Sequence, residues 1–215
     1  MKIGILGSGD VAKTLAAGFL EHGHDVMLGT REPAKLDEWA AAHPTARVGS
    51  FADAAAFAEL ALLAVKGGAA EAALKAAQAD RHLAGKVVID ATNPIADLPP
   101  EQGVLRFFTS LDEGLMERLQ RAYPGLRFVK AFNSVGAALM IDPQLPGGRP
   151  TMFICGDEAA AKSTVTGLLA EVGWDAADMG GAVASRAIEP LCMLWCIPGF
   201  LRNDWVHAFK LVSPA

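Results

Sequence analysis

Residues 2–12 read KIGILGSGDVA, and this stretch decides the fold of the chain. The apolar run at residues 3–6 predicts a buried strand. The pattern GxGxxA at residues 7–12 is typical of the turn that joins a first strand to a first helix in a dinucleotide-binding unit. The first glycine permits the tight turn, the second lets a pyrophosphate approach the backbone, and the small third residue lets helix and strand pack closely. An ordinary strand-to-helix turn is the alternative, but the position of the motif favours a phosphate cradle at the start of the helix.

The second expected strand ends with Leu28, Gly29, Thr30 and Arg31. A site for NAD(H) usually has an aspartate or glutamate there, which accepts the ribose hydroxyls. This chain instead has a hydroxyl and a guanidinium, and Lys35 lies about one helical turn later. A phosphomonoester carries roughly −1.5 to −2 charge, so charge-assisted bonds would favour the 2′-phosphate of NADP(H). The alternative is that Arg31 and Lys35 are solvated surface cations.

Apolar segments alternate with helical patterns along most of the chain, which predicts a Rossmann-type, doubly wound α/β fold with a mostly parallel sheet. Strands are expected at residues 3–6, 25–28, 47–48, 60–65, 86–90, 127–132, 151–155 and near 175. A capping-box pattern at Ser110 and Glu113 predicts the start of a helix. A last apolar helical region is expected at residues 185–211, interrupted at Pro198 and Gly199.

The segment at residues 142–150 is rich in proline and glycine and is the best candidate for a domain boundary. We therefore expect an NADP-binding domain at residues 1–141. A smaller C-terminal α/β part would follow at residues 142–215.

The composition excludes several classes of protein. The chain has 215 residues, 52% of them hydrophobic, and a formal net charge of −5, which argues against a nucleic-acid surface. Its three cysteines lack the spacing of a zinc site or a disulfide framework, so we expect no metal. The apolar stretch near Pro198 is too short to span a bilayer. No signal peptide is visible, and we expect a cytoplasmic protein without a membrane partner.

The chain resembles the NADP oxidoreductase, coenzyme F420-dependent family, which includes the F420H2:NADP oxidoreductases and the reductase domain of the STEAP metalloreductases. The resemblance covers nearly the whole chain in the right order. The matching stretches are residues 3–12, residues 29–31 with Lys35, and residues 87–94, 129–134, 151–157 and 185–191.

The resemblance implies hydride transfer, with NADP(H) bound to the N-terminal domain. It also implies that the C-terminal part, residues 142–215, closes the substrate cleft, and we expect this part to form a homodimer. It implies that the cofactor is bound by Gly7, Ser8, Gly9, Asp10 and Val11 at the pyrophosphate, Thr30, Arg31 and Lys35 at the 2′-phosphate, Ala64, Val65 and Lys66 along the ribose and diphosphate channel, Asn93 at the nicotinamide ribose, and the backbone of Ala137 at the carboxamide. Asn133 and Ser134 would border the ring of the second substrate. Asn133 stands where we expect a histidine in the archaeal members that use the deazaflavin, so the acceptor stays open between coenzyme F420, FMN and another ring.

No residue stands out as the catalytic acid or base. Lys130 could donate a proton, or it could pair with a carboxylate. Arg186 and Glu189, three residues apart, suggest a structural ion pair. Cys192 and Cys196 are more typical of a buried helix face than of redox chemistry. The leading hypothesis is an NADPH-dependent oxidoreductase. The alternatives are a flavin-assisted ferric or cupric reductase and a non-enzymatic NADP(H) sensor.

Overall fold

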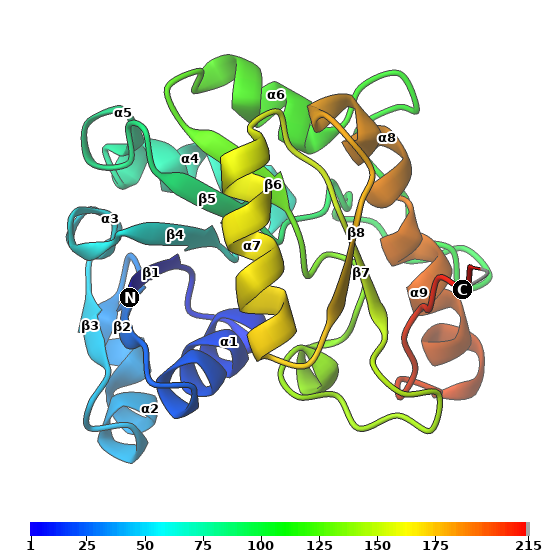
Figure 1. The fold of residues 1–215 in the computed structure, drawn as a ribbon, viewed down its shortest axis with the longest axis horizontal. Coiled ribbons are helices and arrows are strands. Elements are labelled where there is room, and N and C mark those ends of the chain that lie inside the picture. Colours follow the sequence, from blue (N-terminus) through cyan, green and yellow to red (C-terminus); the bar gives the residue numbers. More distant parts are fainter. Residues whose placement is uncertain (214–215) are drawn as a thin grey trace.

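The structure, a computed structural model, describes residues 1–213. Its main sheet has six parallel strands in the order β3-β2-β1-β4-β5-β6. The strands are β1 (Lys2–Leu6), β2 (Asp25–Gly29), β3 (Arg47–Gly49), β4 (Leu60–Leu63), β5 (Val87–Asp90) and β6 (Arg127–Lys130). This is the doubly wound order: β2 and β3 are added on one side of β1, and β4, β5 and β6 are added on its other side. The structure confirms the predicted fold class, and Figure 1 shows the sheet with its flanking helices.

Alternate residues of β1 face the two sides of the sheet. Ile3 and Ile5 belong to the apolar cluster that includes helix α1 (Asp10–Glu21), whereas Leu6 belongs to the cluster on the other face. Gly4 faces α3 (Phe51–Phe57) so closely that an added Cβ would lie 2.2 Å from the backbone oxygen of Ala54. The strand is therefore buried on both faces, as a central parallel strand must be.

The other helices of the N-terminal region cover the sheet or connect its strands. They are η1 (Pro33–Leu36), α2 (Asp37–Ala42), η2 (Gly67–Ala69), α4 (Ala70–Ala76), α5 (Ala79–His82), α6 (Leu115–Ala122) and η3 (Ala137–Leu139). The C-terminal region contains β7 (Thr151–Ile154), α7 (Ala159–Glu171), β8 (Asp175–Asp178), η4 (Ala182–Ala184), α8 (Ser185–Ile188) and α9 (Leu191–Arg202).

Strands β7 and β8 form a separate parallel pair beside β6. The backbone N–H of Lys130 donates to the carbonyl of Cys155 over 2.9 Å and joins the two sheets. Helix α7, yellow in Figure 1, packs against both β6 and β8. Its buried residues belong to the same apolar cluster as Ile3 and Ile5, so one core continues beneath both sheets. The domain boundary at residue 142 stays a prediction.

Two of the expected helix limits are wrong. The helix predicted to start at Ser110 begins at Leu115 instead, after Gly114. The helical region predicted to reach residue 211 ends at Arg202, because Asn203 takes a left-handed conformation (φ 55°) that stops the helix. Pro198 lies inside α9 and does not interrupt it.

The chain after α9 folds back over the C-terminal part. The N–H of Thr151 donates to the carbonyl of Phe209 over 2.8 Å, so residues beyond the helix run beside β7. Within residues 1–213, we find no helix with both the length and the apolar character that a bilayer crossing requires.

Candidate functional site

The turn after β1 has the geometry of a phosphate cradle. A Cβ added to Gly7 would lie 2.2 Å from the backbone oxygen of Ala64, so only glycine fits at that position. A Cβ added to Gly9 would meet nothing within 4 Å. Gly9 caps α1 without a side-chain hydrogen bond, and the N–H of Lys13 donates to its carbonyl over 3.0 Å. The helix therefore presents its first amides to an open space, which suits an anion.

A cavity of about 330 Å³, cavity 1, opens in front of this turn. Ser8, Gly9 and Lys66 contribute to its lining. The lining also includes residues from the end of β2 and the loops beside it and from the loop after β4: Thr30, Arg31, Glu32, Lys35, Phe51, Ala64 and Val65. The structure thus brings the first three residues of the predicted pyrophosphate turn, the predicted 2′-phosphate residues and the predicted β4 loop into one hollow, whereas Asp10 and Val11 do not line it.

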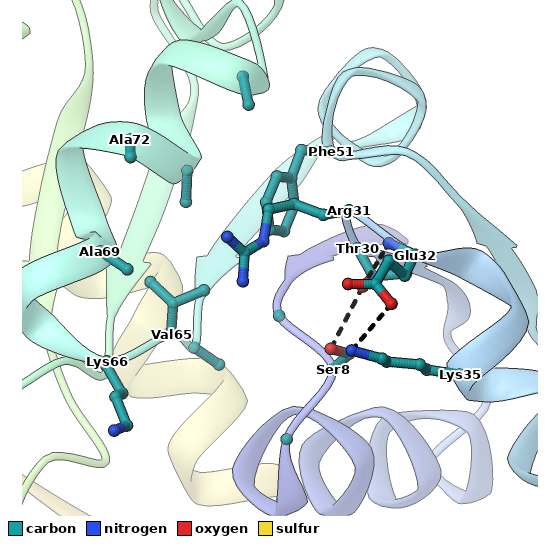
Figure 2. A pocket seen from close by; sticks show the side chains of 15 residues that line it. Ser8, Thr30, Arg31, Glu32, Lys35, Phe51, Val65, Lys66, Ala69 and Ala72 are labelled. Atoms are coloured by element: carbon teal, nitrogen blue, oxygen red, sulfur yellow. Dashed lines mark hydrogen bonds and ion pairs between the residues drawn. The ribbon is translucent and has the colours of Figure 1, made fainter.

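Thr30 connects the turn to the end of β2. Its buried hydroxyl donates to Ser8 Oγ over 3.3 Å and accepts the N–H of Glu32 over 3.3 Å. Figure 2 shows Arg31 extending beside Phe51 toward Val65, where it borders the hollow. The positions of these side chains agree with a site for a phosphorylated ribose.

Glu32 is a lining residue that sequence reasoning missed. Its carboxylate lies 2.9 Å from Lys35 Nζ, and Figure 2 shows the two side chains meeting above Ser8. The hydrogen bond from Lys35 lowers the pKa of Glu32, so the carboxylate is charged at neutral pH. The signal was present in the sequence, since an acidic residue directly follows Arg31.

A second cavity, cavity 2, has a volume of about 670 Å³ and shares Val65, Lys66 and Ala69 with cavity 1. Its lining continues with Gly67, Gly68, Ala91, Thr92, Asn93, Ile95, Ala96, Asp97 and Phe108. It therefore lies between the loops that follow β4 and β5. Its size is within the range of small-molecule sites, about 300–1,000 Å³.

Asn93 and Asn133 bond to each other across the ends of β5 and β6. Asn93 Nδ2 donates to the backbone oxygen of Asn133 over 2.7 Å, and Asn133 Nδ2 donates to Asn93 Oδ1 over 3.1 Å. Asn133 also donates to the carbonyl of Ile188 over 3.0 Å. Asn93, expected at the nicotinamide ribose, lines cavity 2. Asn133, expected beside the ring of the second substrate, does not line it, because Asn133 is 3% exposed and held by these bonds.

The backbone before Asn133 is strained. Phe132 has a φ of 62°, a conformation that costs a non-glycine residue about 1–3 kcal/mol. The ring of Phe132 is buried, which holds the residue in place. Ser134 is buried as well. Contact of Asn133 and Ser134 with a second substrate stays a prediction.

Lys130 forms a buried ion-pair cluster behind this edge of the sheet. Its Nζ lies 2.7 Å from Asp90 and 2.9 Å from Glu189, and it donates to the carbonyl of Thr92 over 2.9 Å. Burial alone would lower the pKa of Lys130, but attraction and hydrogen bonds from Asp90 and Glu189 raise it above its ordinary value. Lys130 therefore stays charged and fully partnered, which supports the carboxylate pairing rather than proton donation.

The expected pair of Arg186 and Glu189 is wrong. Arg186 instead makes a two-pronged bond to Glu117, with N–O distances of 2.7 and 2.8 Å. Glu189 lies just past the end of α8 and turns inward, where it accepts the N–H groups of Leu115 and Met116 over 2.8 and 2.9 Å. These two bonds satisfy the first amides of α6, which explains why that helix begins at Leu115.

The cysteines and Ala137 lie outside the two cavities. A hydrogen bond with Cys196, together with burial, raises the pKa of Cys192, and burial raises the pKa of Cys155 to about 12. Cys192 is buried, as the core-packing interpretation predicts, whereas Cys196 is half-buried and its hydrogen bond with Cys192 lowers the pKa of its thiol. Ala137 begins η3 and lines neither cavity, so its contact with the carboxamide stays a prediction.

Across residues 1–213, no group of three or more His, Cys, Asp or Glu side chains is arranged to hold a metal ion.

Comparison with known proteins gives a family model that matches the N-terminal part of the chain and a solved structure that matches nearly all of it. The model of the family described as NADP oxidoreductase, coenzyme F420-dependent, matches residues 2–94. A protein from Arthrobacter sp. FB24, provisionally described as an F420-dependent NADP reductase, has a crystal structure similar to this one. The two chains share 34% sequence identity, and their structures superpose with a TM-score of 0.92. That match covers 99% of this chain and 100% of the Arthrobacter chain.

Metalloreductase STEAP3 of Rattus norvegicus is 32% identical over 208 residues, which is 93% of this chain. The chain spans only 39% of the length of STEAP3. An imine reductase of Streptomyces aurantiacus shares the fold, with 17% sequence identity and a TM-score of 0.70. The match covers 94% of this chain and 63% of the imine reductase chain.

Proposed function

The chain belongs to the NADP oxidoreductase, coenzyme F420-dependent family and is an NADP-dependent oxidoreductase, and we propose that it transfers a hydride between NADP(H) and a ring acceptor such as coenzyme F420 or a flavin. The observation that carries the proposal is the open space at Gly9, which faces the same hollow as Thr30, Arg31 and Lys35. A glycine that admits a pyrophosphate and cations that suit a 2′-phosphate are the two features that NADP(H) requires.

The residues of the site fit this cofactor. The amides at the start of α1 would bind the pyrophosphate, and Arg31 and Lys35 would bind the 2′-phosphate. Ala64, Val65 and Lys66 lie where cavities 1 and 2 meet and would line the path between the two halves of the cofactor. When bound, NADP(H) supplies the hydride, and the protein supplies position and a water-poor cleft.

The acceptor would bind in cavity 2. Asn93, which lines this cavity, is held by Asn133 and would orient the nicotinamide ribose. Ile95 and Phe108 offer apolar surface to a ring. In this proposal Asn133 acts by holding Asn93, and contact of Asn133 or Ser134 with the acceptor ring stays a prediction. Lys130 would keep the end of β5 in place through its bond to Thr92.

Turnover of NADPH against a panel of acceptors tests the proposal. We expect oxidation of NADPH with at least one of F420, FMN, riboflavin or a quinone. Binding of NADPH without turnover on any acceptor would indicate the NADP(H) sensor and contradict the proposed activity.

The similarity to STEAP3 favours a second candidate, a flavin-assisted reductase of ferric or cupric ions. This candidate predicts metal reduction that depends on added flavin. Reduction of F420 in the absence of metal, with no flavin-dependent metal reduction, would exclude it. We also propose that the chain forms a cytoplasmic homodimer through residues 142–215, which light scattering of the purified protein would test.

A further inference from the structure

Cavity 1 contains an acidic side chain where a phosphate site would be expected to have none. The charged residues in its lining are Arg31, Lys35, Lys66 and Glu32, so a single carboxylate shares the hollow with three cations. The residues that the family resemblance assigns to the 2′-phosphate are Thr30, Arg31 and Lys35, and Glu32 is not among them. Glu32 follows Arg31 directly, and it therefore lies at the point that distinguishes NADP(H) from NAD(H).

Local contacts hold Glu32 at this position. Its N–H donates to the Thr30 hydroxyl, and its carboxylate lies 2.9 Å from Lys35 Nζ. Pro33 begins η1 and keeps Glu32 in an extended conformation, with φ −134° and ψ 84°. Lys35 is on the same short helix, which places the two side chains together without help from a distant part of the chain.

We propose that Glu32 competes with the 2′-phosphate of NADP(H) for Lys35 and thereby limits the preference of the site for NADP(H) over NAD(H). This inference rests on the proposed function, which puts the 2′-phosphate beside Arg31 and Lys35. A phosphate of roughly −1.5 to −2 charge can bind Lys35 only if the carboxylate gives up that contact or tolerates a second anion beside it. NAD(H) has no such phosphate and leaves the pair intact. The cost therefore falls on one of the two cofactors.

The pair itself contributes little stability, which makes the competition easy to shift. Glu32 and Lys35 have side chains that are 60% and 66% exposed, and exposed ion pairs are weak. The phosphate can therefore win Lys35, but at a reduced affinity. We expect removal of the carboxylate charge to raise the affinity for NADPH and to leave the affinity for NADH nearly unchanged.

Titration of the full chain with NADPH and with NADH tests this, using Glu32→Gln and the control Glu38→Gln. Glu38 is an exposed acid on α2 outside the cavity lining, so its substitution makes the same change in net charge. We expect Glu32→Gln to raise the ratio Kd(NADH)/Kd(NADPH) about threefold to tenfold, and Glu38→Gln to change it less than about twofold. The gain should be smaller in a Lys35→Met background, because there is then no lysine to compete for.

The outcomes separate the inference from the proposed function. Wild-type protein that binds neither dinucleotide contradicts the proposed function, and the inference falls with it. Wild-type protein that prefers NADPH, together with a Glu32→Gln variant that behaves like Glu38→Gln, overturns the inference alone. An equal gain with and without Lys35 also overturns it, since the carboxylate would then act by direct repulsion.

Discussion

Lys130 shows how a charge can be buried at the centre of this molecule. Its Nζ has three acceptors within 2.9 Å, which come from segments that meet at the site: Asp90 at the end of β5, Thr92 two residues later, and Glu189 just past the end of α8. A buried ion pair is weak evidence for stability, but breaking one is costly because it leaves an uncompensated charge. The cluster therefore fixes the arrangement of these segments more than it stabilises the fold.

Lys130→Met should lower the free energy of unfolding by about 3–5 kcal/mol, since it leaves two buried carboxylates, Asp90 and Glu189, without their cation. Urea denaturation measures the change. Lys66→Met is the control, because its pair with Asp97 is almost fully exposed, and we expect it to cost less than about 1 kcal/mol. Equal effects of the two substitutions would contradict a structural role for Lys130.

The two glycines of the first turn should respond oppositely to substitution. Gly9→Val should abolish binding of NADPH and leave the fold intact, because its side chain enters the space that we assign to the pyrophosphate. Gly7→Ala should destabilise the fold, because its Cβ would meet the backbone oxygen of Ala64. Circular dichroism with a cofactor titration separates the two effects. Normal binding by Gly9→Val would show that the pyrophosphate lies elsewhere.

At this scale, the sequence predicts the residues whose role depends on near neighbours. Gly7, Gly9 and Thr30 can be identified from a local pattern, and the structure brings them to one cavity. The partners of Arg186 and Glu189 cannot be identified in this way. Glu117 and Lys130 are distant along the chain, and only the packed fold brings them into contact.

Helix α6 is the element that depends most on its surroundings. Glu117 accepts the N–H of Gly114 and closes the start of the helix, while its carboxylate also receives both prongs of Arg186 from α8. Ser110 and Glu113 resemble a cap in the sequence, but Glu113 pairs with Arg118 and Arg121 on the helix itself. Two competing caps of similar pattern lie four residues apart, and long-range bonds decide between them.

Glu117→Gln should weaken the link between α6 and α8 in a pH-dependent way. The hydrogen bond from Arg186 lowers the pKa of Glu117 below its ordinary value of 4.5. A carboxylate with a lowered pKa stabilises the fold fully above that ordinary value and loses the effect as the pH falls through the folded-state pKa.

The wild-type protein should therefore be more stable than Glu117→Gln by about 1–2 kcal/mol near pH 7, and the difference should shrink below pH 4.5. Urea denaturation at several pH values measures it, with Glu71→Gln as an exposed control on α4. A difference that does not change with pH would show that Glu117 acts through packing rather than charge.

The strands were more predictable than the helix ends. The unbroken apolar run at β4 and the short run at β1 predict buried parallel strands, because each strand is covered on both faces. The end of α9 was not predictable from periodicity, since the apolar pattern continues past Arg202. Its end depends on the left-handed Asn203 and on bonds between the following chain and β7.

For the whole molecule, the strand order is the feature that locates the site. The strand order changes side between β1 and β4, which is the switch point of the sheet. Both cavities lie at the carboxyl ends of the strands beside this point. The alternation of strands and helices predicts this arrangement from the sequence. A backbone hydrogen bond between Lys130 and Cys155 joins the C-terminal β7–α7–β8 unit to the main sheet. A displacement of this unit would therefore also move the end of β6 beside the site.

The central proposal is that Arg31 and Lys35 bind the 2′-phosphate and so favour NADP(H). Titration of the wild type and of the double variant Arg31→Ala/Lys35→Ala with NADPH and NADH tests it most directly. We expect the wild type to bind NADPH more tightly than NADH. The double variant should lose affinity for NADPH by at least about tenfold, at roughly 1.5–3 kcal/mol per charged hydrogen bond, and should lose little for NADH. Equal affinity of the wild type for the two cofactors would contradict the assignment of the 2′-phosphate site.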